Sequence, residues 1–391
     1  MASSTSCLNL FVFSFLSVLL ITKSQISGSV NGVVFPVTRD LSTGQYVAEI
    51  RLGDSYEPVN LVVDLSGTLL WFDCTSGHIS TSRSLISGSS SGCLKAKAGN
   101  DRVSSRGDQN GDCELLVRNG VVGITARGEL ATDVLSYGSV ASQGTVDLLF
   151  ACAPPLLLRG LPSGAQGVMG LSKAQISLPS QLAAETNEPR RLTVYLSPSN
   201  GVVSTRSVED VFGAAAARSL VYTPLSTTSS GGYLINVKSI RVNGFMLAVN
   251  GTLSAELSTL VPYTTMESSL YAVFADAYVK AAASNAKSVA PVAPFGLCFT
   301  STSSSDFPAV DLALQSEMVR WRIQGENLLV DVGGGVQCLG IVDGGSNRVS
   351  PITMGGLQLE GFVLDFDLGN SVMGFGERTR SSLDSFRQEA L

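Results

Sequence analysis

The chain has 391 residues, a formal net charge of −6 and 44% hydrophobic residues. This length and apolar content predict two domains or one large bilobal unit and exclude a disordered chain. The 40 glycines favour short strands and turns over long helices. The acidic balance excludes the basic surface that nucleic-acid binding requires, so no nucleic acid is expected as a partner.

The chain begins with a segment, residues 1–27, that is interpreted as a secretory signal peptide. Its apolar run, residues 8–21, has the length of a signal-peptide core and is too short to cross a bilayer comfortably. Cleavage is expected between residues 24 and 28. No later segment is long and apolar enough to span a membrane. We therefore expect a secreted, extracellular protein with no membrane association after signal removal.

The first half beyond the signal predicts strands. Apolar and polar residues alternate over 46–52, which indicates a half-buried strand. The apolar run at 61–72 predicts two buried strands around a tight turn. Residues 75–112 are rich in Ser, Gly, Arg and Asp and predict loops held by cysteines. A helix is expected at 176–185, with Ser177 as its cap. Further strands are predicted at 145–153, 167–172 and 190–198.

The second half repeats this organisation. Residues 231–244 alternate as a hairpin does, and apolar residues at helical spacing predict a helix over 267–285. The tail from 337 to 376 predicts strands broken by Gly and Asp turns. The sequence therefore predicts two β-rich halves with few helices.

The cysteines indicate disulfides. Six of the seven remain once Cys7 leaves with the signal, and an even number in a secreted chain favours bridges. If bridges form within each half, Cys298 pairs with Cys338. The early four allow three pairings that the sequence leaves open: Cys74, Cys93, Cys113 and Cys152. Asn250 heads the one Asn-x-Ser/Thr sequon and is a candidate glycosylation site.

The single histidine, His78, removes much of the catalytic repertoire. It lies in a Ser-rich stretch and is interpreted as a surface loop residue. A zinc site would need companion ligands, and the cysteines are assigned to disulfides. The string "DVGGGVQ" lacks the lysine of a phosphate-binding loop. No metal and no cofactor are expected, so carboxylate chemistry remains.

The string "VVDLSGT" places Asp64 at the end of a buried strand, and it resembles the first active-site motif of pepsin-like aspartic proteases. The strings "GVMGLS", "ISLPSQL", "FPAVDLAL" and "GFVLDFDLGNSVMGFG" extend this resemblance over residues 32–378. It implies an all-β-dominated bilobal fold of two pseudo-symmetric barrel-like lobes with a few short helices. The expected lobes are 32–190 and 191–391.

Pepsin-like catalysis needs two aspartates that share one proton, one from each lobe. Counting back from the helix that carries Tyr271, the resemblance puts Ser258 at the second position. A hydroxyl of ordinary acidity cannot share a proton with Asp64. The similar string "IVDGGS" is rejected, because Asp343 lies 279 positions after Asp64 whereas Ser258 lies 194 after it. Asp343 is interpreted as a turn residue.

Three further departures from the protease pattern accompany the serine. In the first motif Leu65 and Ser66 replace the threonine and the glycine, and in the second motif Leu260 replaces the glycine. The expected flap, "CELLVRNGVVGITARGELATD", contains no tyrosine. The resemblance therefore implies a protein without proteolytic activity, in which Asp64 and Ser258 are vestigial positions.

The strings "DLSG", "LSTLVPYTTM" and "MGGLQLEGFVLDFD" are similar to those of a plant group within this fold: wheat-type xylanase inhibitors, extracellular dermal glycoproteins and basic 7S globulins. This resemblance implies a monomeric defence protein of the plant cell wall (the apoplast) that binds and inhibits a microbial xylanase or endoglucanase. The inhibitory contact is assigned to the tail, to Arg378 or Arg380, because arginine can pair with a carboxylate. The alternatives are an active aspartic endopeptidase and an extracellular storage or peptide-binding globulin.

Overall fold

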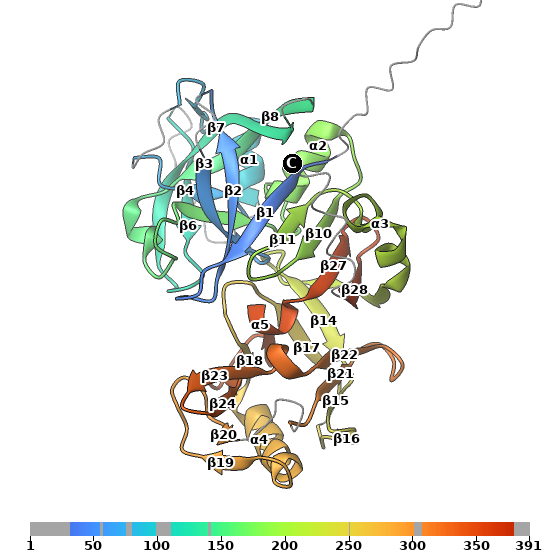
Figure 1. Ribbon diagram of the computed structural model, residues 1–391. Helices are drawn as coiled ribbons and strands as arrows, with labels where there is room; N and C mark the ends of the chain where they lie inside the picture. The colour runs from blue at the N-terminus through green and yellow to red at the C-terminus, as the bar shows by residue number, and fades with distance from the viewer. Residues whose placement is uncertain are drawn as a thin grey trace, which may run out of the picture.

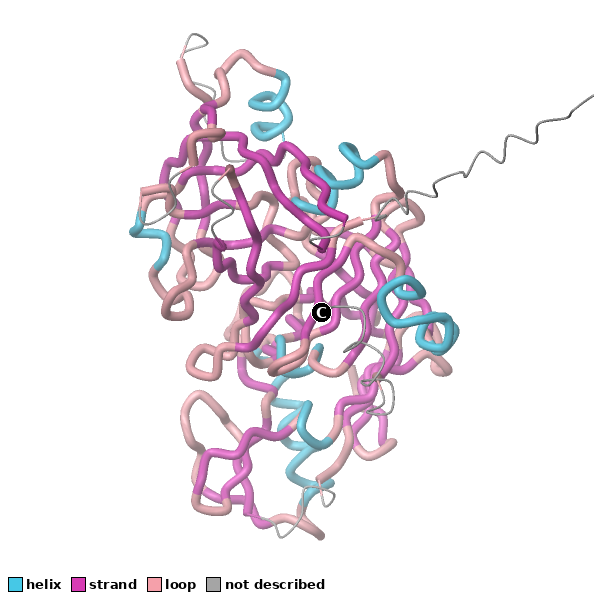
Figure 2. The backbone as a smooth tube through the Cα atoms, turned by 45° about the horizontal axis from the view of Figure 1, so that its top comes forward, coloured by secondary structure: helices cyan, strands magenta, loops and turns pink. Residues whose placement is uncertain are grey.

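The computed structural model describes residues 32–54, 58–75, 80–98, 111–139, 142–249, 251–300 and 307–378. Within these ranges the chain forms two lobes, one from the first half and one from the second (Figure 1). Figure 2 shows that strands make up most of both lobes and that the helices are few and separate. The expected all-β-dominated bilobal fold is confirmed.

The largest sheet forms the first lobe and continues between the lobes. Its strands run in the order β12-β28-β27-β10-β11-β1-β2-β3-β9-β4-β8-β7-β5, with β6 paired to β7. The bounds are β1 (Val34–Arg39), β2 (Tyr46–Leu52), β3 (Pro58–Asp64), β4 (Trp71–Phe72), β5 (Ser84–Leu85), β6 (Glu114–Arg118), β7 (Thr125–Ser139), β8 (Ser142–Cys152), β9 (Gly167–Gly170), β10 (Arg191–Tyr195), β11 (Gly201–Ser204), β12 (Val221–Pro224), β27 (Phe362–Asp367) and β28 (Val372–Glu377).

Three smaller sheets build the second lobe. One runs in the order β13-β14-β17-β26-β18-β25, one β16-β15-β21-β22 and one β19-β20-β24-β23. The bounds are β13 (Ser226–Thr227), β14 (Tyr233–Val237), β15 (Ser239–Val242), β16 (Phe245–Met246), β17 (Leu253–Leu257), β18 (Thr264–Met266), β19 (Lys287–Val289), β20 (Cys298–Thr300), β21 (Val310–Ala313), β22 (Arg320–Ile323), β23 (Leu329–Gly333), β24 (Val336–Leu339), β25 (Ile341–Asp343) and β26 (Ile352–Met354).

The helices lie between these strands. They are α1 (Ser91–Ala98), α2 (Leu178–Thr186), α3 (Val208–Ser219), α4 (Ser268–Ala282), α5 (Gly356–Leu359) and the 3₁₀ turns η1 (Pro155–Leu158) and η3 (Gly325–Asn327). None of these helices is long and apolar enough to cross a bilayer.

Most of the predicted elements are confirmed. β2 alternates between buried and more exposed residues, β3 and β4 are the two strands expected at 61–72, and α4 is the helix expected at 267–285. Hydrophobic periodicity identified these elements because their buried residues recur at strand or helix spacing.

One prediction in the first half is wrong, and another is confirmed in position only. Residues 75–112 were expected to be loops, but α1 forms there because Cys93 and Ala96 are buried against the first lobe. Ser177 is the N-cap residue of α2, as predicted, but its hydroxyl donates to the carbonyl of Ala174 at 2.8 Å and accepts no helix N–H. Tertiary burial and a local turn decided these two features, and periodicity reports neither.

The two lobes are joined by continuous strand pairing. β10 pairs with β11 on one side and with β27 on the other, both antiparallel, so strands from both ends of the chain lie together in the middle of the molecule (Figure 1). A hydrophobic core of buried residues extends from Val33 in the first half to Phe375 in the second. The expected lobe boundary between residues 190 and 191 remains a prediction, because the sheet does not end there.

Three disulfides are present among the described residues. Cys74 is bonded to Cys152, linking the ends of β4 and β8, and Cys93 to Cys113, which ties α1 to β6. Cys298 is bonded to Cys338 across paired strands β20 and β24, the pairing expected for the two late cysteines. Each bridge restricts the unfolded chain and contributes about 3–5 kcal/mol in the chain-entropy account.

Candidate functional site

Asp64 ends β3 in the middle of the first lobe and is 7% exposed. Its Oδ1 accepts hydrogen bonds from the backbone N–H of Ser66 at 2.9 Å and from the Ser66 hydroxyl at 2.8 Å. A Cβ at Gly67 would lie 2.9 Å from the other carboxylate oxygen, Oδ2, so only glycine lets the backbone pass this close. The turn therefore holds the carboxylate in one orientation.

The second lobe contains a counterpart of the strands around Asp64. In the first lobe β3 is parallel to β9, β4 is antiparallel to β9, and β4 is parallel to β8. In the second lobe β17, β26, β18 and β25 pair in the same three ways. Ser258 follows β17 directly, so it stands at the end of a strand equivalent to the strand that Asp64 ends.

Thr259 brings the two strand ends together. Its hydroxyl donates to the carbonyl of Val63 at 2.5 Å and accepts the N–H of Leu65 at 3.2 Å, so it contacts the residues on both sides of Asp64. Both Thr259 and Leu65 are fully buried. Leu65 has no hydroxyl that could form the reciprocal hydrogen bond to the second lobe. The connection at this point is therefore one-sided, because only the Thr259 side chain forms these hydrogen bonds between the lobes.

Leu260 fills the space between the second lobe and the β6–β7 hairpin. It is buried and belongs to the hydrophobic cluster of the first lobe, together with Leu115 and Val117 of β6. A Cβ at Gly120, in the turn of the hairpin, would lie 2.6 Å from Leu260 Cδ1. The turn thus rests on a leucine from the opposite lobe, where the protease pattern has a glycine.

The hairpin turn is fixed by Asn119, which is fully buried. Its Nδ2 donates to the carbonyls of Leu157 and Arg159 at 2.7 and 2.8 Å, and its Oδ1 accepts the N–H of Val121 at 2.7 Å. Sequence analysis missed this residue, although an Asn-Gly pair is a turn signal and Asn119-Gly120 lies within the expected flap. The hairpin is consequently anchored to η1 on one side and to Leu260 on the other.

A second carboxylate, Glu256 on β17, lies near Asp64 and was not predicted. A Cβ at Gly232 would be 3.1 Å from Ser66 Cβ and 3.3 Å from Glu256 Oε1, so the Asp64 turn and Glu256 face each other there. Burial and the charge of Asp64 raise the pKa of Glu256, and Arg348 opposes this. Two acidic groups of raised pKa therefore meet between the lobes.

Replacing Asp64 with asparagine is expected to stabilise the protein at neutral pH by on the order of 1–3 kcal/mol. Burial raises the pKa of Asp64 against the hydrogen bonds from Ser66 and Gly67 and the charge of Arg118. The unfolded chain therefore ionises this group first, and the stability falls as the pH rises above its ordinary pKa of 3.8 until the folded group ionises. Denaturant unfolding across this pH range should show a smaller fall for the asparagine variant.

Asp343→Asn is the matched control for this prediction, with the opposite sign. Hydrogen bonds from the N–H of Gly345 and the hydroxyl of Ser268 lower the pKa of Asp343. Its contribution is present above the unfolded pKa and lost as the pH falls, so removing this carboxylate should lower the stability at neutral pH. A destabilised Asp64→Asn variant at neutral pH would contradict the prediction.

The other sequence-predicted residues lie apart from this region or outside the described residues. Asp343 is exposed at the start of α4, where its Oδ1 accepts from the Ser268 hydroxyl at 2.7 Å and acts in a turn, as expected. His78, Asn250 and Arg380 are outside the described residues.

Arg378 is described, and its side chain is packed. The guanidinium carbon lies 4.6 Å from the ring centre of Phe212 on α3 and 5.1 Å from that of Tyr195 on β10. Cation–π contacts of this kind hold an arginine in place. These contacts pack the side chain of Arg378 against the protein, and its assignment as an inhibitory contact remains a prediction.

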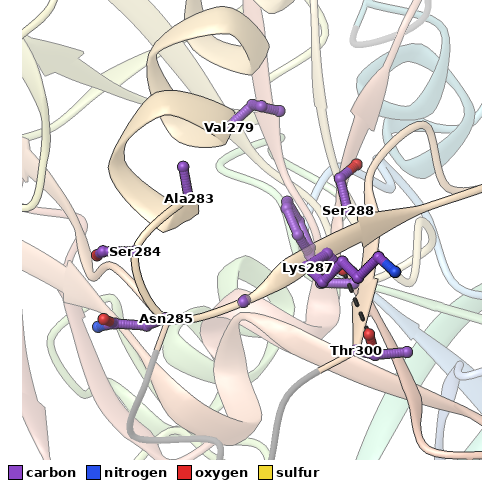
Figure 3. A pocket seen from close by; sticks show the side chains of 9 residues that line it. Val279, Ala283, Ser284, Asn285, Lys287, Ser288 and Thr300 are labelled. Carbon is purple, nitrogen blue, oxygen red and sulfur yellow. Dashed lines mark hydrogen bonds between the residues drawn. The ribbon is translucent and has the colours of Figure 1, made fainter.

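A hollow of about 710 Å³ lies at the end of α4, away from Asp64. It is lined by the end of this helix and by β19 and β20, including Val279, Lys287 and Phe299, and Thr300 donates from its hydroxyl to the Lys287 carbonyl at 3.5 Å (Figure 3). Over the ranges given above, no group of three or more His, Cys, Asp or Glu side chains is placed to hold a metal ion.

Both halves of the chain match known sequence families. Residues 46–205, with Asp64 and the hairpin, match the family described as xylanase inhibitor N-terminal, and residues 232–377, with Ser258, match xylanase inhibitor C-terminal. The chain belongs to this xylanase-inhibitor-like family. Its pepsin-like fold is the one implied by the sequence resemblance.

Relatives of the xylanase-inhibitor-like chain have diverse names. It is 35% identical to a Nicotiana benthamiana protein called probable aspartic proteinase GIP2, over 95% of each chain. Its structure is similar to the crystal structure of edgp, with a TM-score of 0.80 and 36% identity over 88% of this chain and 94% of that one. Basic 7S globulin from soybean gives a TM-score of 0.79 and 33% identity over 90% and 96%.

Proposed function

We propose that the protein is secreted, lacks proteolytic activity and inhibits microbial glycoside hydrolases that degrade the plant cell wall, such as a xylanase or an endoglucanase. The observation that carries the proposal is the pair Ser258 and Leu260. The serine stands where a second carboxylate would be needed, and the leucine occupies the space under the hairpin. A site built in this way cannot hold a water between two carboxylates that share a proton.

The scaffold supports a role in binding another protein. Three disulfides and a core continuous between the lobes hold the surface loops in fixed positions, and disulfides fit an oxidising extracellular compartment. Both family matches carry the description xylanase inhibitor. Glycoside hydrolases present a pair of carboxylates in an open cleft, which a protein surface with complementary charge can cover.

The deciding experiment is a titration of fungal xylanases and endoglucanases from several structural families with the purified protein. We expect at least one enzyme to lose its activity in proportion to the amount added and to form a stoichiometric complex. No inhibition and no complex across the whole panel would overturn the proposal. Expression of the protein in plant tissue, followed by N-terminal sequencing of the mature chain, tests the predicted signal peptide. Detection of the protein in the isolated apoplastic fluid tests the predicted location.

An active aspartic endopeptidase is the second candidate, because one relative has that name. Incubation with a denatured protein at acid pH, with and without pepstatin, separates the two. We expect no pepstatin-sensitive cleavage, and Asp64→Asn should change nothing in this assay. A storage or peptide-binding globulin, the role suggested by the name of the soybean relative, predicts seed abundance or a bound peptide in place of inhibition.

A further inference from the structure

The sheet β16-β15-β21-β22 carries several large apolar side chains on the surface of the second lobe (lower right in Figure 1). Phe245 and Met246 form the edge strand β16 and are 77% and 56% exposed, and Met318, in the connection between β21 and β22, is 90% exposed. Arg241 is opposite Met246 in the strand register, and its guanidinium bonds Glu317, the neighbour of Met318, at 2.8 Å. Met246 and Met318 thus form one surface with this ion pair, whereas Phe245 is opposite the buried Val242 and points to the other side of the sheet.

Three arginines lie on the same sheet. Arg241 and Arg322 flank the buried Asp311 across β15, β21 and β22, and Arg322 Nη1 is 3.8 Å from Asp311 Oδ1. Arg322 also donates from Nε to Gln324 at 2.9 Å, and Arg320 donates from Nε to the carbonyl of Glu317 at 2.6 Å. These bonds hold the side chains before any partner arrives, which reduces the entropy lost on binding.

The charge of this surface is opposite to that of the chain. Its three arginines exceed the two carboxylates that contact them, Asp311 and Glu317, in a protein of net charge −6. Arginine, methionine and aromatic residues are the types enriched in protein–protein interfaces, and arginine pairs with carboxylates through two parallel hydrogen bonds. Positive charge beside exposed apolar groups matches an acidic protein surface that also carries apolar groups.

We propose that this surface, formed by Met246, Met318, Arg241, Arg320 and Arg322 and called here the arginine face, is where the protein docks an acidic partner protein. The partner inserts carboxylates between the arginines and covers the edge strand β16. Resting on the proposed function, the partner is a glycoside hydrolase whose carboxylate-bearing cleft rim meets the face. This assignment replaces the C-terminal tail as the contact surface.

The test uses the full-length protein and a variant with four changes: Met246→Ser, Met318→Ser, Arg320→Gln and Arg322→Gln. The serines replace side chains that are already exposed, and glutamine at 322 keeps a donor for the buried Asp311. The matched control removes two exposed apolar groups and two exposed arginines elsewhere: Leu41→Ser, Val349→Ser, Arg51→Gln and Arg127→Gln. Equal thermal unfolding of the three proteins establishes that all are folded.

Two probes are used. The first is poly-glutamate at low ionic strength. The unchanged protein and the control should bind it with a salt-sensitive affinity, and the face variant should bind about tenfold more weakly. The second is each glycoside hydrolase of the panel that the unchanged protein binds, with the same expected loss of about tenfold in affinity for the face variant only.

The outcomes separate the docking face from the proposed function. If an enzyme is bound equally by the face variant and the unchanged protein, the docking face is overturned while the inhibitory function stands. If poly-glutamate binds through the face and no enzyme is bound, the acidic-partner face stands and the inhibitory function fails. If the unchanged protein does not bind poly-glutamate, or if the face variant binds it equally, recognition of acidic partners by this face is overturned.

Discussion

Replacing Thr259 with valine is expected to lower the free energy of unfolding by about 2–5 kcal/mol. The hydroxyl of Thr259 serves two buried backbone groups at once, the carbonyl of Val63 and the N–H of Leu65. Valine has nearly the same shape, so the substitution leaves no cavity and removes only these bonds. Each buried group left without a partner costs about 1–3 kcal/mol. Urea unfolding followed by tryptophan fluorescence measures the change.

The matched control for this substitution is Thr265→Val on β18. The hydroxyl of Thr265 is buried and has no hydrogen-bond partner among the described residues, so valine there removes no bond. We expect no loss of stability, or a small gain, because an unpartnered hydroxyl is replaced by a methyl group. Equal losses at the two positions would show that the one-sided bond of Thr259 does not hold the lobes together.

Replacing Leu260 with alanine is expected to cost about 2–4 kcal/mol and to loosen the β6–β7 hairpin. Leu260 is buried in the cluster of the first lobe although it belongs to the second, so its truncation leaves a cavity between the lobes. The turn at Gly120 loses the side chain on which it rests. Hydrogen exchange should become faster at the turn, residues 119–124, and remain unchanged in β27 and β28.

Leu94→Ala on α1 is the control for Leu260, because Leu94 is exposed and its truncation should have little effect on stability. A substitution at Ser258 tests the proposed lack of proteolytic activity. Ser258→Asp alone should leave the protein without pepstatin-sensitive cleavage, since Leu260 still fills the space under the turn. Strong cleavage by that single variant would show that Leu260 does not close the site.

These expected outcomes concern how a pepsin-like fold is maintained in a protein that is proposed to lack proteolytic activity. The carboxylate of Asp64 keeps its turn and its hydrogen bonds from Ser66, while Thr259 keeps a bond across the lobes. Leu260 strengthens the contact between the lobes, because it adds buried apolar surface there. The interior then serves as a rigid support for the surface loops, and under the proposed function the surface binds the partner protein.

The sequence by itself determined the strands and helices with strong periodicity, such as β2 and α4, and the bilobal fold that its motifs resemble. It also placed Asp64 at the end of a buried strand, whereas the assignment of Ser258 to the second position remains a prediction from its spacing to the α4 helix. It placed Cys298 opposite Cys338, since only two cysteines lie in the second half.

Only the tertiary structure decided the rest. The burial of Leu260, the anchoring of Asn119 and the proximity of Glu256 to Asp64 each join residues more than 35 positions apart, and no local pattern encodes such contacts. The packing of Arg378 against Phe212 and Tyr195 is likewise visible only in the structure. The arginine face arises because β15 pairs with β21, far along the chain, which brings Arg241, Asp311 and Arg322 into register. The sequence fixes the chemistry of each side chain, whereas the packing of the fold decides which other side chains it contacts.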